Sequence, residues 1–153
     1  MNSSTWTVLG YEAGRELPVG RTLNRFNLIY FLPMELRQRR ASKHAKRREA
    51  YEVPLIPGIV FIRGQDTWMK ATEAKYTEDS PLSDTSGNPW RIPEPQMSAF
   101  QSAVAEWNET VRKRTMANKD APKLKKRTVK FTPDALADIK SELFGAGTMG
   151  QAA

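Results

Sequence analysis

The sequence predicts an α+β fold in which a mostly antiparallel sheet of about four strands is flanked by helices. Two patterns carry this prediction: a continuous apolar strand at Ile59–Arg63, and a run from Met97 to Val111 whose apolar residues recur at helical spacing. At 153 residues, the chain has room for one such domain and for extensions.

The N-terminal segment supplies a strand, a helix and a second strand. Thr5–Leu9 has the residue types of a strand. Glu12–Phe26 has the composition of a helix, but Pro18 lacks an amide hydrogen and is tolerated only in a first turn. The regular part of this helix is therefore expected to begin at Leu17 or Pro18. The second strand is predicted at Leu28–Leu32, where a proline follows.

The strand Ile59–Arg63 is introduced by the turn pair Pro57 and Gly58. Its first four residues are all apolar, so neither face of the strand is suited to contact water. We therefore expect a central strand. One face would pack on the core, and the other would be covered by a helix of this chain or by a partner protein.

The next segments complete the predicted sheet and its main helix. Asp66 is placed to cap a short helix that extends through Lys75. Residues 77–91 are rich in turn-forming residues, and Trp90–Ile92 is predicted to return to the sheet as an edge strand. Beyond it, five apolar residues alternate spacings of three and four, which places them on one helix face. We assign this stripe to core packing: Met97, Phe100, Val104, Trp107 and Val111.

The net charge of +7 is concentrated in two segments. Leu36 to Arg48 holds seven cations and no acid, and Arg112 to Lys130 holds nine cations against one Asp, which leaves the rest of the chain at −8. Two basic runs on an acidic body suggest segments that bind polyanions, with salt-dependent affinity that does not read sequence. The alternative is that both runs are solvated loops.

The basic runs also define the predicted organisation of the chain. Residues 1–111 form the domain, and its basic arm at 36–50 has no apolar stripe. We expect that arm to be mobile, or to be a frayed helix that orders on binding. Residues 112–131 are expected to be a basic linker. Residues 132–153 are expected to form a short amphipathic helix and tail, because they begin with the helix-start signal Thr-Pro-Asp.

The residue content argues against several classes of function. The chain has no Cys, and its one histidine, His44, lies in a basic run, so zinc sites and histidine-dependent nucleophilic catalysis are not expected. We therefore predict a protein that is not an enzyme and has no cofactor. The chain also lacks a secretory signal and any apolar run near the length of about 20 residues that crosses a bilayer, which predicts a soluble, cytoplasmic protein without membrane contact.

Four motifs in a fixed order resemble those of one known family. The most specific is Val53–Gly64, which reads Val-Pro-Leu-Ile-Pro-Gly-Ile-Val-Phe-Ile-Arg-Gly. It is preceded by Trp6–Glu12 and Tyr30–Pro33, and it is followed by Pro93–Pro95 before the last helix of the domain. Across residues 5–110 this order resembles the N-terminal domain of the NusG family, the transcription elongation and antitermination factors that include RfaH.

The resemblance implies an α+β sandwich that binds RNA polymerase, with an apolar patch resting on the clamp helices of the largest subunit. We expect Trp6, Tyr11, Ile59 and Phe61 to make this contact, with Trp6 equally suited to the core. We make the transcription-factor assignment depend on these side chains being accessible on the folded chain. The bound protein, a monomer when free, would hold the clamp closed over the DNA cleft and modulate pausing and termination, with antitermination as the expected outcome.

The resemblance also assigns roles to the cations. Arg15, Arg21 and Arg25 lie where the first helix of the family presents basic residues to the non-template DNA strand. The basic arm occupies the place of a variable hairpin loop whose tip would reach along the polymerase. We include its seven cations among the residues that bind non-template DNA or nascent RNA: Arg37, Arg39, Arg40, Lys43, Lys46, Arg47 and Arg48.

Members of the family normally carry a small barrel, the KOW domain, after such a linker. The residues after Lys130 show no strand pattern able to build it, so the module is absent, is replaced by the predicted helix, or the chain is cut short. Two other functions remain open, an RNA- or ribosome-binding protein without polymerase contact and a nucleoid-type basic protein. The basic runs contain no aromatic residue for base stacking, which counts against sequence-specific recognition of single-stranded RNA.

Overall fold

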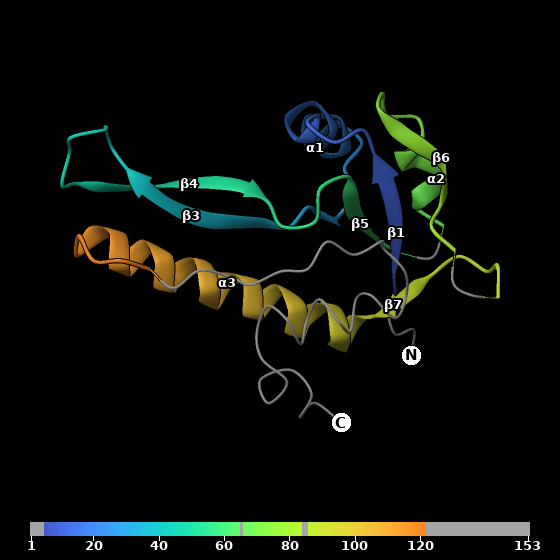
Figure 1. Ribbon diagram of the computed structural model, residues 1–153. Coiled ribbons are helices and arrows are strands. Elements are labelled where there is room, and N and C mark those ends of the chain that lie inside the picture. The colour runs from blue at the N-terminus through green and yellow to red at the C-terminus, as the bar shows by residue number, and fades with distance from the viewer. Residues whose placement is uncertain (1–4, 65, 84–85, 122–153) are drawn as a thin grey trace.

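The computed structural model describes residues 5–64, 66–83 and 86–121 (Figure 1). Its centre is a five-stranded antiparallel sheet in the order β2-β5-β1-β6, with β7 also paired to β1. The fold is therefore of the predicted α+β class. The strands of this sheet are β1 (Thr5–Tyr11), β2 (Tyr30–Phe31), β5 (Ile59–Arg63), β6 (Thr77–Pro81) and β7 (Arg91–Pro93).

Strand β5 has the predicted boundaries and lies inside the sheet, between β1 and β2. It runs antiparallel to β1, with Trp6 opposite Arg63 and Gly10 opposite Ile59. Pro57 and Gly58 precede it, and Gly58 adopts the positive φ of 83° that glycine tolerates best. The prediction of a central strand is confirmed.

Helices cover both faces of the sheet (Figure 1). Because successive side chains of a strand point to opposite faces, Ile59 and Phe61 enter one core cluster, and Val60 and Ile62 enter another. The first cluster lies against α3, which supplies Met97, Phe100 and Val104, and the second lies against α1 and α2, which supply Val19, Leu23 and Ala71. The helices span Glu16–Arg25 (α1), Trp68–Ala71 (α2) and Glu94–Met116 (α3).

The stripe predicted for the last helix forms most of its buried face. Met97, Phe100, Val104 and Val111 are buried, whereas Trp107 is partly exposed. Met97 and Phe100 lie in the core cluster next to the sheet. The assignment of this stripe to core packing is confirmed for four of its five members.

From its composition we expected the basic arm to be a mobile segment or a frayed helix. This expectation is wrong. The arm forms a regular hairpin of β3 (Met34–Arg40) and β4 (Arg48–Pro54), paired in register from Met34 opposite Pro54 to Arg40 opposite Arg48. The hairpin extends away from the main sheet and lies along the C-terminal half of α3 (Figure 1). It takes the form that the resemblance implied for this position.

Several other boundaries differ from the predictions. Helix α3 continues through Met116, so the first five residues assigned to the basic linker are helical. Residue Thr67, and not Asp66, precedes α2, and no side-chain hydrogen bond caps that helix. Strand β2 covers only Tyr30 and Phe31, which is shorter than the predicted Leu28–Leu32. The helix predicted at 132–153 lies outside the described residues.

Helix α1 begins at Glu16, which places Pro18 in the first turn as its missing amide hydrogen requires. None of the helices in the described part of the chain combines the length and the apolar character that a bilayer crossing requires.

Candidate nucleic-acid and polymerase interfaces

The β3–β4 hairpin is fixed to α3 by side-chain amides, beginning with Asn108. The amide N–H of Leu36 donates to Asn108 Oδ1 (2.8 Å), and Asn108 Nδ2 donates to the carbonyl of Met34 (2.9 Å). One side chain therefore satisfies a donor and an acceptor on the backbone of β3. Leu36 is buried, and so is Val111, which lies one turn after Asn108 on α3.

Gln38 makes the second connection, near the end of α3. Its Nε2 donates to Thr115 Oγ1 (3.0 Å) and to the carbonyl of Lys119 (2.9 Å), while its Oε1 accepts from the amide of Ala121 (3.0 Å). A single amide side chain thus holds both the last turn of the helix and the residues that follow it. These bonds hold the residues from Lys119 to Ala121 against β3.

Arg48, the first residue of β4, makes the third connection. Its amide donates to Asn118 Oδ1 (3.0 Å), its guanidinium also donates to the carbonyl of Asn118, and its Nε pairs with Asp120 Oδ1 (2.8 Å). Asn118 has a positive φ of 55°, which Asn tolerates better than most residues and which turns the chain back toward the hairpin. The tip of the hairpin and the end of α3 are therefore held together.

The cations of the hairpin fall into two groups. Arg37 pairs with Glu35 (2.7 Å), and Arg39 pairs with Glu49 (2.7 Å) while lying over the ring of Tyr51 (4.7 Å). The remaining cations of the tip are exposed and have no ion pair among the described residues: Arg40, Lys43, Lys46 and Arg47.

The end of α3 adds cations that belong to the second basic run. Arg112 pairs with Glu109 (2.5 Å), and Lys113, Arg114 and Lys119 are exposed. Residues 40–48 and 112–121 together hold nine cations and one acid, a net charge of +8. From the sequence we had treated the two runs as separate segments, because the amide contacts that join them leave no periodic signal.

A groove of about 830 Å³ lies between the hairpin and the C-terminal half of α3. Val111 supplies part of its apolar wall, and the rest is mainly polar. Most charges in the groove are paired, as Glu35 is with Arg37 and Arg48 is with Asp120. The exposed tip, and not the groove, is therefore the more attractive surface for a polyanion.

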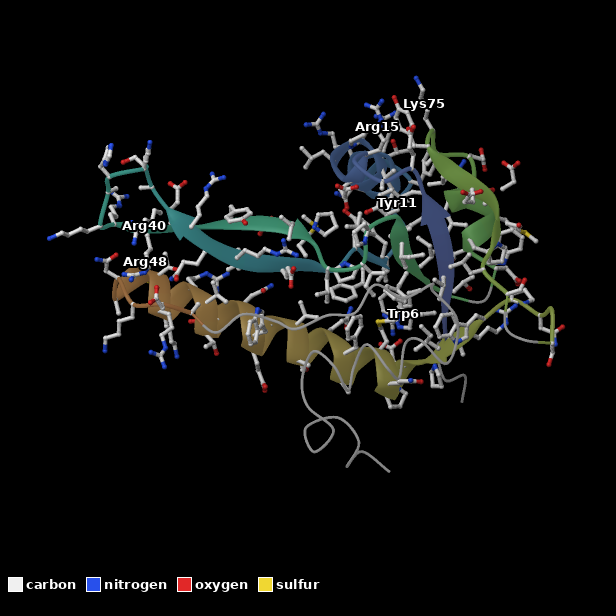
Figure 2. The ribbon with its side chains drawn as sticks, viewed as in Figure 1. Trp6, Tyr11, Arg15, Arg40, Arg48 and Lys75 are labelled. Carbon is white, nitrogen blue, oxygen red and sulfur yellow. The ribbon has the colours of Figure 1, made fainter. Side chains whose placement is uncertain are left out.

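A second basic area lies on α1. Arg15, Arg21 and Arg25 are all exposed, and Arg21 and Arg25 share one helix face because they are four residues apart. Arg15 pairs with Glu12 (3.2 Å) and lies over the ring of Tyr76, 4.8 Å from its centre. Lys75 also contacts that ring (5.1 Å). Figure 2 shows Arg15 and Lys75 above the main sheet, beside α1 and β6, and Arg40 and Arg48 at the far left, where the hairpin and α3 end.

The four residues expected to contact a polymerase are buried, which corrects that expectation. Trp6, Tyr11, Ile59 and Phe61 are 3%, 4%, 7% and 0% exposed. The Phe61 ring packs between α3 and β2, with ring centres 6.0 Å from Phe100 and 6.3 Å from Phe31. A side chain enclosed in this way has almost no area to offer a partner.

Trp6 and Tyr11 are held in different ways. Trp6 Nε1 donates to Glu94 Oε2 (2.8 Å), which joins β1 to the first turn of α3. The Tyr11 hydroxyl is buried without a well-formed hydrogen bond to any described residue. Burial, and next the carboxylate of Glu16, raise the pKa of Tyr11 above its ordinary value. Neither environment is that of a docking side chain.

Exposed apolar side chains occur instead at the C-terminal end of β5. Ile29 is 56% exposed, and its carbonyl accepts from the amide of Arg63 (2.9 Å). Met69, on α2, is 57% exposed, and Lys70 beside it lies over the ring of Phe26 (4.7 Å). The end of α1, the start of β2 and α2 therefore meet here and leave apolar area open to solvent.

The chain matches the sequence model of a known protein family. The family model described as "Transcription termination factor nusG" matches residues 4–101, which is more than half of the chain. The matched region contains the main sheet, α1, α2, the hairpin and the first two turns of α3. None of the curated proteins matches this chain.

Proposed function

Because this chain belongs to the NusG family, we propose that it binds RNA polymerase across the DNA cleft and suppresses pausing and termination. The family consists of transcription elongation and termination factors that are not enzymes and that interact with RNA polymerase. The match over residues 4–101 is the observation that carries the proposal. The α+β sandwich supports it, because its layers agree with the fold that the family implies.

The proposed mechanism is a shift in the equilibrium of the polymerase clamp. A protein that contacts both sides of the cleft binds the closed clamp more tightly than the open one, and it stabilises the closed state by that difference in affinity. Open-clamp states lead to pausing and termination. Suppressing a pause tenfold needs a preference of only about 1.4 kcal/mol.

We assign the polymerase contact to an apolar patch that consists of the exposed Ile29 and Met69 and the partly exposed Phe26. The patch lies at the end of the strand that carries the family motif, and its side chains have area to give to a partner. The apolar residues at the centre of such a contact usually contribute most of its affinity. The buried residues Trp6, Tyr11, Ile59 and Phe61 then act by shaping the sheet behind the patch.

Nucleic acid would be bound at the basic areas of the same molecule. Arg15, Arg21 and Arg25 are exposed along α1, where they can line the path of the non-template strand. The hairpin cations, from Arg37 to Arg48, would contact nucleic acid at the far end. The contact would be made mainly to phosphate, because the described side chains that we assign to it are all cations.

Retention of polymerase on the immobilised chain at moderate salt, after nuclease treatment, tests the proposal. We expect Ile29→Glu combined with Met69→Glu to weaken retention at least about tenfold, because two charges would be placed in an apolar contact. Met116→Glu is the matched control, since Met116 is 83% exposed at the far end of α3.

Two results would count against the proposal. If nuclease treatment releases all partners from the wild-type chain, the protein binds nucleic acid and not polymerase. If the Ile29 and Met69 double variant retains polymerase as well as the Met116 variant does, the contact lies elsewhere on the surface.

A further inference from the structure

We propose that the hairpin tip and the end of α3 form one preorganised surface for the phosphate backbone of double-stranded DNA. This surface, here called the basic end, comprises residues 40–48 and 112–121. The choice of DNA rests on the proposed function, which places the protein at a polymerase on a DNA template. The choice of a duplex rests on the structure.

The first argument is the balance of charge at the basic end. Its nine cations come from two parts of the chain and face a single acid of the same segments. Seven of the nine have no ion pair among the described residues, the exceptions being Arg48 with Asp120 and Arg112 with Glu109. Exposed ion pairs contribute little stability, so keeping these cations unpaired costs the fold little and leaves them available for phosphates.

The second argument is that the array is held in place. The hairpin is paired along its whole length, and the bonds from Asn108, Gln38 and Arg48 fix it to α3 and to the residues after it. A duplex presents phosphates at fixed positions, since it is stiff over about 150 base pairs. A fixed array of cations matches such a lattice without the ordering cost that a flexible arm would incur.

The third argument is the lack of a platform for base stacking. Residues 40–48 and 112–121 contain no Phe, Tyr or Trp. The nearest aromatic residue along the hairpin is Tyr51, and the guanidinium of Arg39 already lies over its ring. Surfaces for single strands combine cations with aromatic side chains on which bases stack, whereas a surface that contacts only phosphates suits a duplex.

The fourth argument is the position of the basic end. Strand β3 rises about 3.4 Å per residue, so its seven residues carry the tip about 20 Å from the base of the hairpin. Figure 1 shows the hairpin and the C-terminal half of α3 projecting together away from the sheet. The basic end can therefore hold a duplex while α1 and the apolar patch of Phe26, Ile29 and Met69 remain accessible.

The test is a salt titration of binding between the whole chain and a short blunt DNA duplex. We expect Arg40→Gln, Lys43→Gln, Lys46→Gln and Arg47→Gln together to weaken binding and to lower the slope of log K against log salt by about two to four, near 0.9 for each lost phosphate contact. Lys113→Gln with Arg114→Gln should lower it by about one to two.

The control is Lys70→Gln with Lys75→Gln, which removes the same charge as the Lys113 and Arg114 pair from α2 and the residues before β6, outside the basic end. We expect it to change the slope by less than half as much. Thermal unfolding followed by circular dichroism should show that all variants fold, because every substituted side chain is exposed. Among these side chains only Lys70 forms an ion pair with a described residue, Glu73.

Three results would overturn the inference: equal effects of the two double variants, binding of a single strand of the same length as tightly as the duplex, or tighter binding of an RNA duplex than of the DNA duplex. The proposed function is tested separately by the nuclease-treated polymerase retention. The hairpin variant should keep that retention, and failure of the wild-type chain to retain polymerase would leave the duplex measurement valid.

Discussion

At the scale of single residues, the Tyr11 hydroxyl is a buried polar group with poorly satisfied hydrogen bonding, as is Trp107 Nε1. Tyr11 lies in the cluster between the sheet and α1, and its hydroxyl has no well-formed hydrogen bond among the described residues. A buried polar group without a partner costs free energy that an apolar group of the same shape does not. The neighbouring carboxylate of Glu16 adds a further penalty to the ionised form.

We predict that Tyr11→Phe leaves the free energy of unfolding at pH 7 unchanged or raises it by up to about 1 kcal/mol. Because the pKa of Tyr11 is raised in the folded chain, above pH about 10 the unfolded chain releases this proton while the folded chain keeps it. Wild-type stability should therefore fall with rising pH in that range, by up to about 1.4 kcal/mol per pH unit from this residue.

Urea unfolding of both proteins between pH 7 and 11 measures this effect. The other tyrosines and the lysines contribute equally to both proteins, so the difference between the two curves isolates Tyr11. A difference that does not change with pH, or a loss of more than about 2 kcal/mol in the variant at pH 7, would show that the hydroxyl has a partner after all.

The pattern of apolar residues predicted which side chains would be covered, but not which part of the molecule covers them. The run Ile59–Ile62 was expected to have both faces covered, by a helix or by a partner protein. Phe61 packs against Phe100, a member of the stripe that had been assigned to the core from its spacing alone. Phe61, which was expected to contact the polymerase, thus packs inside the domain against the apolar stripe of α3. Its burial removes the docking surface on which the assignment from sequence depended, and the family assignment rests instead on the match over residues 4–101.

At the scale of elements, the hairpin and α3 behave as one unit because polar side chains join them. Asn108 is central, since its amide group satisfies both the Leu36 amide and the Met34 carbonyl. We predict that Asn108→Ala destabilises this unit by about 1–3 kcal/mol, because two backbone groups lose their partner at a partly buried site. Exchange of the Leu36 amide hydrogen should be at least about tenfold faster.

Thr110→Ala is the control for this prediction. Thr110 lies on the same helix, is exposed, and donates only to the carbonyl of Glu106 within its own helix. The prediction fails if the two variants show the same exchange at Leu36. The main sheet should keep its protection in both, because the Asn108 contacts do not reach it.

The elements that follow hydrophobic periodicity were predictable, and the hairpin was not. Strand β5 and the buried stripe of α3 appear where their apolar spacing predicted them. The hairpin Met34–Pro54 is held by backbone pairing and by Asn108, Gln38 and Arg48, and such contacts have no period that a sequence reveals. The resemblance to the family supplied the hairpin that residue patterns did not. For the same reason the meeting of the two basic runs could not be foreseen.

At the scale of the whole molecule, the proposed binding areas occupy separate regions. Figure 2 shows Arg15, beside α1, above the main sheet, and Arg40, in the basic end, at the far end of the hairpin. The apolar patch near Ile29 belongs to the part of the fold that contains α1 and α2. A molecule arranged in this way can contact protein and nucleic acid at the same time, as a factor that bridges a cleft must.

The lifetime of a defined pause, measured with purified RNA polymerase in the presence and absence of this protein, tests the central claim most directly. We predict a shorter lifetime at saturating protein, by up to about tenfold, which corresponds to a preference of about 1.4 kcal/mol for the closed clamp. A lifetime that stays the same at concentrations that saturate binding would contradict the account.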